Sequence, residues 1–239
     1  MEVESLYQEP DHVQEHLAWG ALEFVDVFKI YRSGIVETVA LRGLDLRVEP
    51  REFVAVFGPS GSGKSSMLHL AAALDEPSAG DVRALGEPLS RLGMEELDAY
   101  RARKVALVFQ SGNLWPTLTA EENVVLSLRL TGPARAAEEA ESALAAFGLA
   151  DRRGRRAGVL SGGEQQRVAI AAAAARKALL VLADEPTAEL DEQNEELVLA
   201  ALRRLRDVFG STVVVVTHSH RVADAADRVV ELRDGRVVQ

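Results

Sequence analysis

One stretch of the chain, residues 58–66 (GPSGSGKSS), constrains the fold more than any other. An apolar run at residues 53–57 leads into this stretch, and a helix-forming run at residues 67–74 leads out of it. The pattern G-x-x-x-x-G-K-[ST] between a strand and a helix is typical of a phosphate-binding loop. The alternative is a Gly/Ser loop that fits the pattern by chance, and the flanking strand and helix disfavour it. We therefore predict an α/β fold with a nucleotide site at this loop.

The residue types in the loop suit a polyphosphate. Glycines let the backbone turn tightly and bring its N–H groups close to the ligand. Lys64 supplies a positive charge for the β- and γ-phosphates, and the Ser65 hydroxyl can ligate Mg²⁺. The helix that begins near Gly63 points its positive dipole end at the same anion. The residues expected to contact the nucleotide are Gly58, Pro59, Ser60, Gly61, Ser62, Gly63, Lys64, Ser65 and Ser66.

Composition limits the classes of protein to which the chain can belong. Its formal net charge of −10 argues against a free-standing nucleic-acid binder, so no nucleic-acid partner is expected. The lack of cysteine excludes disulfides and thiolate metal sites and fits a reducing compartment. No apolar stretch approaches the roughly 18–20 residues needed to span a bilayer. We expect a cytoplasmic protein that works at a membrane only through a partner that supplies the span.

Residues 1–20 are predicted to be a polar tail before a domain at residues 21–239. The tail is acidic and unlike a secretory signal. Its His12 and His16 have the i, i+4 spacing of a metal-binding pair. With no third ligand in sight, solvated tail histidines are the simpler interpretation.

The domain is predicted to combine antiparallel strands, buried parallel strands and a helical insertion. Leu44, Leu46 and Val48 alternate with polar residues, which is typical of a half-exposed antiparallel strand. A helical insertion at about residues 111–177 interrupts the apolar runs that are typical of a mainly parallel core sheet. The predicted strands are residues 21–31, 39–48, 53–57, 82–85, 105–109, 179–183, 212–216, 228–232 and 236–238. The predicted helices are residues 63–74, 90–103, two segments within 119–147, 168–176 and 192–209.

Polar residues follow three of the buried strands: Gln110, the pair Asp184 and Glu185, and His218. The carboxyl ends of parallel strands share the edge at which α/β sheets bind ligands. Asp184 is placed to hold Mg²⁺ through water, and Glu185 to polarise a water in line with the γ-phosphate. Taken singly, Gln110 would be a loop cap, the acids an acidic turn and His218 a structural histidine. The phosphate-binding loop earlier in the chain favours the functional interpretation.

Two further features are less specific when taken alone. Tyr31 ends a predicted strand and can stack on an adenine ring, although strand-end tyrosines more often only pack. The run Ser161, Gly162, Gly163 and Glu164 precedes an Ala-rich helix. Ser161 can cap that helix, and the open N–H groups would make a second anion site. On its own this run would indicate no more than a capped helix start.

Together these motifs resemble the series found in ATP-binding-cassette (ABC) ATPases, over about residues 21–239. In this chain Tyr31 is similar to the aromatic A-loop residue, Gly58–Ser65 to Walker A, Gln110 to the Q-loop, Leu160–Gln165 to the signature, Leu180–Asp184 with Glu185 to Walker B and the catalytic glutamate, Ala188–Asp191 to the D-loop, and His218 to the switch histidine. Several independent motifs in the family's order make a chance resemblance negligible.

The resemblance implies a mechanism and partners. Two copies of the chain would pair head to tail around two Mg-ATP, so that the signature residues of one copy face the phosphate-binding loop of the other. Glu185 would act as general base or water-orienting group, and His218 would contact the γ-phosphate. Gln110 would touch Mg²⁺ and link the site to an integral-membrane permease, seated in the groove between the core and the helical insertion.

Within the family, residues 74–80, 95–101 and 108–110 are similar to the lipoprotein-release and macrolide-export group. That likeness favours an exporter subunit at the inner face of the plasma membrane. A regulatory or mechanical ATPase, as in cell division with an FtsX-type partner, shares every motif and stays an alternative. A soluble ABC ATPase of translation or DNA repair is disfavoured, because the chain has neither a second cassette nor a long coiled coil.

Two positions depart from the family pattern. Glu189 lies in the D-loop where a small or neutral residue is usual, so it would weaken closure of the dimer or find a basic partner. Ser219 follows His218 where an acid is common, which leaves open how the histidine is oriented. Neither change removes a catalytic group, so an active ATPase is expected.

Overall fold

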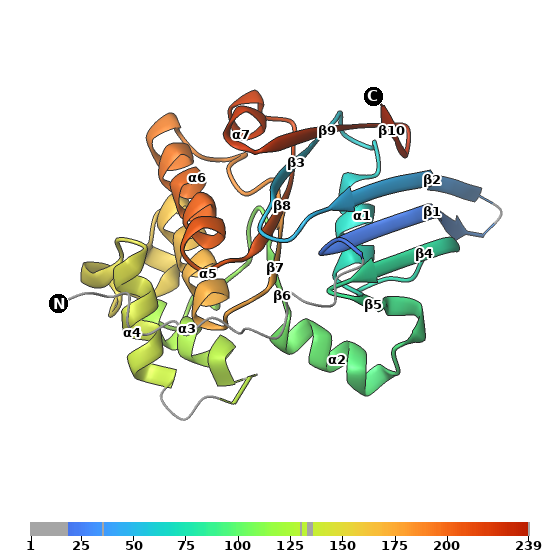
Figure 1. Cartoon of the computed structure of the whole chain (residues 1–239). Helices are drawn as coiled ribbons and strands as arrows, with labels where there is room; N and C mark the ends of the chain where they lie inside the picture. The colour runs from blue at the N-terminus through green and yellow to red at the C-terminus, as the bar shows by residue number, and fades with distance from the viewer. Residues whose placement is uncertain (1–18, 35, 130, 133–135, 239) are drawn as a thin grey trace.

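The computed structural model describes residues 19–34, 36–129, 131–132 and 136–238. Its core is a six-stranded sheet in the order β10-β9-β3-β8-β7-β6 (Figure 1). The strands are β3 (Phe53–Phe57), β6 (Val105–Val108), β7 (Leu180–Asp184), β8 (Thr212–Thr217), β9 (Arg228–Arg233) and β10 (Arg236–Val238). All neighbouring pairs are parallel except β10 with β9. The predicted α/β fold with a mainly parallel core sheet is confirmed.

The middle strands of this sheet are apolar because both of their faces are covered. In β7, Val181 and Ala183 pack into a core shared with the helices, whereas Leu180 and Leu182 pack into a second core on the other face. Successive side chains of a strand point to opposite faces, so one apolar run serves two cores. In Figure 1, helices α3 to α6 lie on one side of this sheet, and α1 lies on the other side with the second sheet.

The second sheet is antiparallel, with the order β2-β1-β4-β5. Its strands are β1 (Leu22–Ser33), β2 (Val36–Val48), β4 (Ala79–Ala84) and β5 (Glu87–Pro88). The predicted alternation is confirmed, since Leu44, Leu46 and Val48 are buried while Asp45 and Arg47 are exposed. This sheet brings the end of β1 beside the phosphate-binding loop.

The helices are α1 (Lys64–Ala71), α2 (Met94–Arg103), α3 (Ala120–Arg129), α4 (Ala136–Ala146), α5 (Gly162–Ala175), α6 (Glu192–Asp207) and α7 (His220–Ala225). Short 3₁₀ turns lie at Leu89–Arg91, Ala150–Arg152 and Ala157–Val159. Within the described residues, no helix is both long and apolar enough to cross a bilayer. The predicted tail, with His12 and His16, lies mostly outside the described residues.

Several helix boundaries differ from the predicted ones. The helix predicted at residues 168–176 is α5, which begins six residues earlier, at Gly162, because Ser161 caps it there. The helix predicted from Ser90 begins instead at Met94, because the Gly93 N–H donates to the Glu96 side chain and fixes the start there. The helix predicted to run to Leu74 ends at Ala71, and Ala73 has a φ of 52°. A left-handed residue ends an α-helix.

Candidate functional site

A cleft of about 650 Å³ opens at the carboxyl ends of the core strands. Four segments supply its walls: the phosphate-binding loop, the antiparallel sheet, the segment after β6 and the end of β7. Its lining residues include Tyr31, Ser60, Gly61, Gly63, Lys64, Ser65, Ser66, Gln110, Asp184 and Glu185. The fold therefore brings together residues that are up to 154 positions apart, from Tyr31 to Glu185.

The phosphate-binding loop is tightly wrapped around the lysine side chain. Lys64 is only 8% exposed, and its Nζ donates to the carbonyls of Gly58 (2.6 Å) and Pro59 (3.1 Å). Gly63 has a φ of 104°, and a Cβ there would lie 2.4 Å from the Ala40 carbonyl oxygen. Only glycine fits that position, which explains why the turn into α1 carries one.

The Glu185 carboxylate is fixed from the end of β8. Its Oε1 lies 2.9 Å from Nδ1 of His218 and 3.9 Å from Nζ of Lys64. Its Oε2 accepts from the Thr217 hydroxyl (3.2 Å) and from the His218 backbone N–H (3.3 Å). Glu185 has a φ of 45°, a left-handed conformation that is uncommon for a residue with a side chain. Several partners hold this carboxylate in one orientation at the mouth of the cleft.

Gln110 lies on the cleft and contacts the unusual D-loop residue. Its Nε2 donates to Glu189 Oε1 at 3.0 Å. The hydrogen-bond partner of Glu189 is therefore a neutral amide and not the basic residue that was one of the two expectations. The backbone of this segment is held by Gln166, whose Nε2 donates to the carbonyls of Phe109 (2.9 Å) and Gln110 (2.6 Å). Gln166 lies on α5 and is 4% exposed. The segment after β6 is therefore tied to the helix that carries the signature residues.

Tyr31 lies at the rim of the cleft and is 39% exposed. Its hydroxyl donates to Asp75 (3.2 Å), and the Lys29 ammonium lies 4.9 Å from the ring centroid and 2.6 Å from Asp75. Burial alone would raise the pKa of Asp75, but hydrogen bonds from Lys29 and the Glu76 amide outweigh it and lower that pKa. A carboxylate that stays charged thus anchors an aromatic ring beside the loop.

The signature residues Ser161–Glu164 lie away from the cleft of their own chain, since none of the four is among the described residues that line it. The Ser161 hydroxyl accepts from the Glu164 N–H (3.2 Å), and Glu164 accepts from the Ser161 N–H (2.9 Å). This reciprocal pair is a capping box, and Arg152 also contacts Glu164 at 2.7 Å. Burial would raise the pKa of Glu164, but the Ser161 N–H and Arg152 lower it overall.

Sequence reasoning missed two buried polar residues, Gln166 and Glu195. Glu195 lies on α6 and accepts hydrogen bonds from Thr187 and from Ser219, the second unusual position. The available signal was a polar residue at a core position of an amphipathic helix. Such a pattern does not say which loop the side chain contacts, so only the fold could reveal these links.

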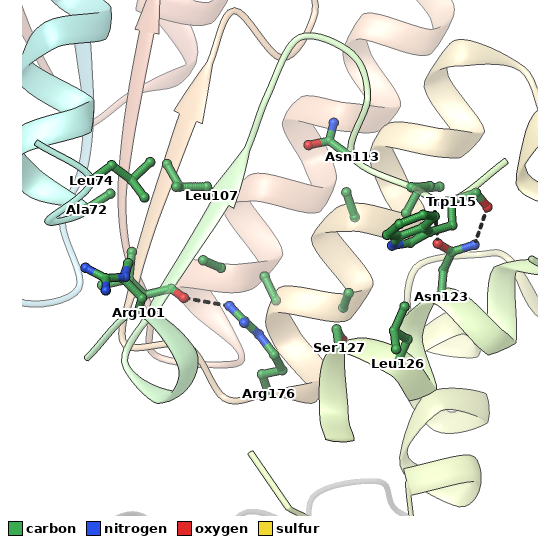
Figure 2. A pocket seen from close by; sticks show the side chains of 16 residues that line it. Ala72, Leu74, Arg101, Leu107, Asn113, Trp115, Asn123, Leu126, Ser127 and Arg176 are labelled. Atoms are coloured by element: carbon green, nitrogen blue, oxygen red, sulfur yellow. Dashed lines mark hydrogen bonds between the residues drawn. The ribbon is translucent and has the colours of Figure 1, made fainter. Parts of the chain in front are cut away.

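A second cleft, of about 410 Å³, lies between the core and helices α3 and α5 (Figure 2). Trp115 lies in its wall with 65% of its surface exposed, and Asn123 holds the backbone of Trp115 through two hydrogen bonds. At its other end Arg176 donates to the Val105 carbonyl at 2.6 Å, and burial lowers the pKa of this guanidinium. The cleft thus has an exposed aromatic ring in its wall and a partly buried guanidinium at its other end.

Comparison with known proteins gives consistent results. The family model described as "ABC transporter" matches residues 41–188. An uncharacterized ABC transporter ATP-binding protein of Thermotoga maritima is 47% identical over 90% of this chain and 93% of its own length. The lipoprotein-releasing system ATP-binding protein LolD of Geobacter metallireducens is 44% identical over 91% and 97%. The macrolide export ATP-binding/permease protein MacB of Azoarcus sp. is 41% identical over 91% of this chain, which spans 33% of that protein.

A solved structure shows the same arrangement of elements. It is the dimeric post-hydrolysis state of the ATP-binding cassette MJ0796 bound to ADP and Pi. It superposes with a TM-score of 0.83 at 38% identity, over 91% of this chain and 97% of that one.

Proposed function

This chain belongs to the ABC transporter family, and we propose which of its residues hydrolyse ATP and what kind of membrane partner it drives. It is an ABC ATPase subunit of the LolD and MacB type. The observation that carries the proposed chemistry is the fixed Glu185 carboxylate, which lies 3.9 Å from the lysine of the phosphate-binding loop and 2.9 Å from His218.

In the proposed reaction the phosphate-binding loop binds the nucleotide, and Glu185 activates the attacking water. Amide groups of residues 58–66 and the Lys64 ammonium bind the phosphates, and Tyr31 stacks on the base. Glu185 accepts a hydrogen bond from a water in line with the γ-phosphorus. The water oxygen bonds to phosphorus and passes a proton to Glu185 while the bond to the bridging oxygen breaks, which leaves ADP and inorganic phosphate. His218 orients Glu185 and contacts the γ-phosphate.

The residues present fit Mg²⁺. Ser65, Gln110 and Asp184 line the same cleft and offer the oxygen ligands that Mg²⁺ prefers. The described residues contain no cluster of three or more His, Cys, Asp or Glu suited to a metal, so phosphate oxygens and water would complete the coordination. When bound, the ion neutralises charge on the phosphate oxygens.

We propose that each complete site needs two copies of the chain. The N–H groups of Gly162 and Gly163 have no acceptor among the described residues, yet they begin a 14-residue helix. Such a helix start favours an anion, and the cleft of its own chain lies elsewhere. Head-to-tail pairing gives these groups the γ-phosphate held by the partner's loop. Dimeric relatives of this fold support the arrangement.

The second cleft is the proposed seat of the permease. Its exposed Trp115 and apolar wall suit a short helix of a membrane protein, and Gln166 ties α5 to the segment that carries Gln110. Permease movement would thereby reach the nucleotide cleft. We infer a peripheral position on the cytoplasmic face of the membrane and a lipoprotein-release or export role, as for LolD and MacB.

The variant Glu185→Gln tests this function. It keeps the hydrogen-bonding shape but removes the base, so we expect ATP turnover to fall by about a hundredfold or more while ATP binding persists. Size-exclusion chromatography with ATP should then show a stable dimer. Glu196→Gln is the control, because Glu196 is 59% exposed and pairs only with Arg203 among the described residues. A monomer under saturating ATP would overturn the proposed pairing.

A further inference from the structure

Glu195 is a buried carboxylate that the proposed chemistry does not use. It lies in the first turn of α6 and is 9% exposed. A carboxylate removed from water costs free energy unless hydrogen bonds and an opposite charge replace its hydration. Its partners therefore indicate why it is there.

Within the part of the chain that the structure describes, the three side-chain partners of Glu195 belong to the two segments that follow β7 and β8. Its Oε1 accepts from the Thr187 hydroxyl at 3.3 Å and from the Ser219 hydroxyl at 3.0 Å. Its Oε2 lies 3.3 Å from Nε of Arg221. Thr187 is two residues after Glu185, and Ser219 is the residue after His218. One carboxylate thus joins the segment that carries Glu185 to the segment that carries His218.

The Ser219 side chain bonds to Glu195 and does not cap the helix that follows it. It is the N-cap of α7, a position where a serine side chain normally accepts a helical N–H. Its side chain makes no such cap bond and donates to Glu195 instead. The Ser219 N–H in turn donates to the Thr217 hydroxyl, which donates to Glu185. The hydrogen bonds thus run from Glu195 through Ser219 and Thr217 to Glu185.

We propose that Glu195 is a positioning residue for ATP hydrolysis. From α6 it supplies a carboxylate to the segment after β8, where position 219 of this chain carries a serine. It thereby keeps Oε1 of Glu185 at 2.9 Å from Nδ1 of His218. Thr187 and Arg221 complete its hydrogen bonding and hold the side chain in place. The inference rests on the ATPase function proposed above.

The test uses the full chain and two readouts. The first readout is steady-state ATP hydrolysis, with kcat and KM determined separately. The second readout is the imidazole NMR signal of His218 without nucleotide, assigned with His218→Gln among the five histidines. Glu195→Ala should lower kcat by about tenfold or more, leave KM for ATP nearly unchanged, and shift or broaden the His218 signal. The matched control is Glu196→Ala, one residue further along the same helix and 59% exposed.

Rescue distinguishes positioning from a merely structural role. Adding Ser219→Asp to Glu195→Ala returns a carboxylate to the segment after β8 and should restore most of kcat. If Glu195→Ala does not fold, Ser219→Ala breaks the same link more gently and should lower kcat in the same sense. An unchanged kcat, or a loss that matches a fall in thermal stability and is not rescued, overturns the inference. An inactive wild type with a His218 signal that responds to Glu195→Ala would instead overturn the proposed ATPase and leave the link intact.

Discussion

The molecule contains two glycine-rich helix starts that resemble each other in sequence and differ in their surroundings. The start at Gly63 faces a cleft and has a lysine as the first residue of its helix. The start at Ser161 has a glutamate in its first turn, closed on Ser161 by a capping box and paired with Arg152. The first start offers phosphate the positive charge of Lys64. At the second start the Glu164 carboxylate is already paired with Arg152, so the N–H groups of Gly162 and Gly163 are what remains to bind an anion. This difference is the physical basis of our proposal that the second start binds an anion held by another chain.

The largest expected effect comes from removing the charge that distinguishes the first start. Lys64→Ala should reduce ATP turnover by about a hundredfold or more, because a desolvated cation beside the phosphates is lost. The stability of the variant should change little, since the only polar partners of the lysine among the described residues are two loop carbonyls and, at 3.9 Å, Glu185. Fluorescent-nucleotide binding and phosphate release measure the effect. Lys104→Ala, in an exposed pair with Glu87, is the control.

The glycines of the second start give the next effect. A Cβ on Gly163 would lie 2.4 Å from Oδ1 and 2.8 Å from Cβ of Asn194, so Gly163→Ala should destabilise the fold by about 1–3 kcal/mol. A Cβ on Gly162 would meet only the flexible end of Leu190, at 3.2 Å. Urea unfolding should therefore separate the two variants. Equal midpoints would show that the contact with Asn194 yields without cost.

The capping box predicts a dependence on pH. The pKa of Glu164 is lowered from its ordinary value of 4.5 in the folded chain, because its hydrogen bonds and Arg152 outweigh the effect of burial. Its stabilisation is therefore full above pH 4.5 and is lost as the pH falls through the folded pKa. Glu164→Gln should lower the free energy of unfolding by about 1 kcal/mol near pH 7. The difference from wild type should become smaller below pH 4.5. Urea titrations at several pH values measure it, with the exposed first-turn Glu95→Gln as control.

These features differ in how far sequence alone predicts them. The residues that end parallel strands, Asp184 and His218 among them, fall on one edge for any such sheet, so their neighbourhood followed from pattern. The partners of Gln166 and Glu195 could not be predicted from the sequence pattern. Helical periodicity shows which face of a helix is buried, but not which loop packs against that face. The charged anchor of the Tyr31 ring at Asp75 joins residues 44 positions apart. Such links depend on tertiary packing, which no local signal carries.

The smallest expected effect concerns Glu189, which contacts the cleft residue Gln110 at 3.0 Å. A negative charge beside the phosphate site repels ATP, so Glu189→Gln should lower KM for Mg-ATP by a few fold while keeping the hydrogen-bonded shape. Because exposed charges are screened by salt, the difference from wild type should shrink between low and high ionic strength. Glu189→Ala removes both the charge and the contact with Gln110. If Ala and Gln behave alike, charge alone accounts for the effect. A loss of kcat only in the Ala variant would instead assign Glu189 a positioning role for Gln110.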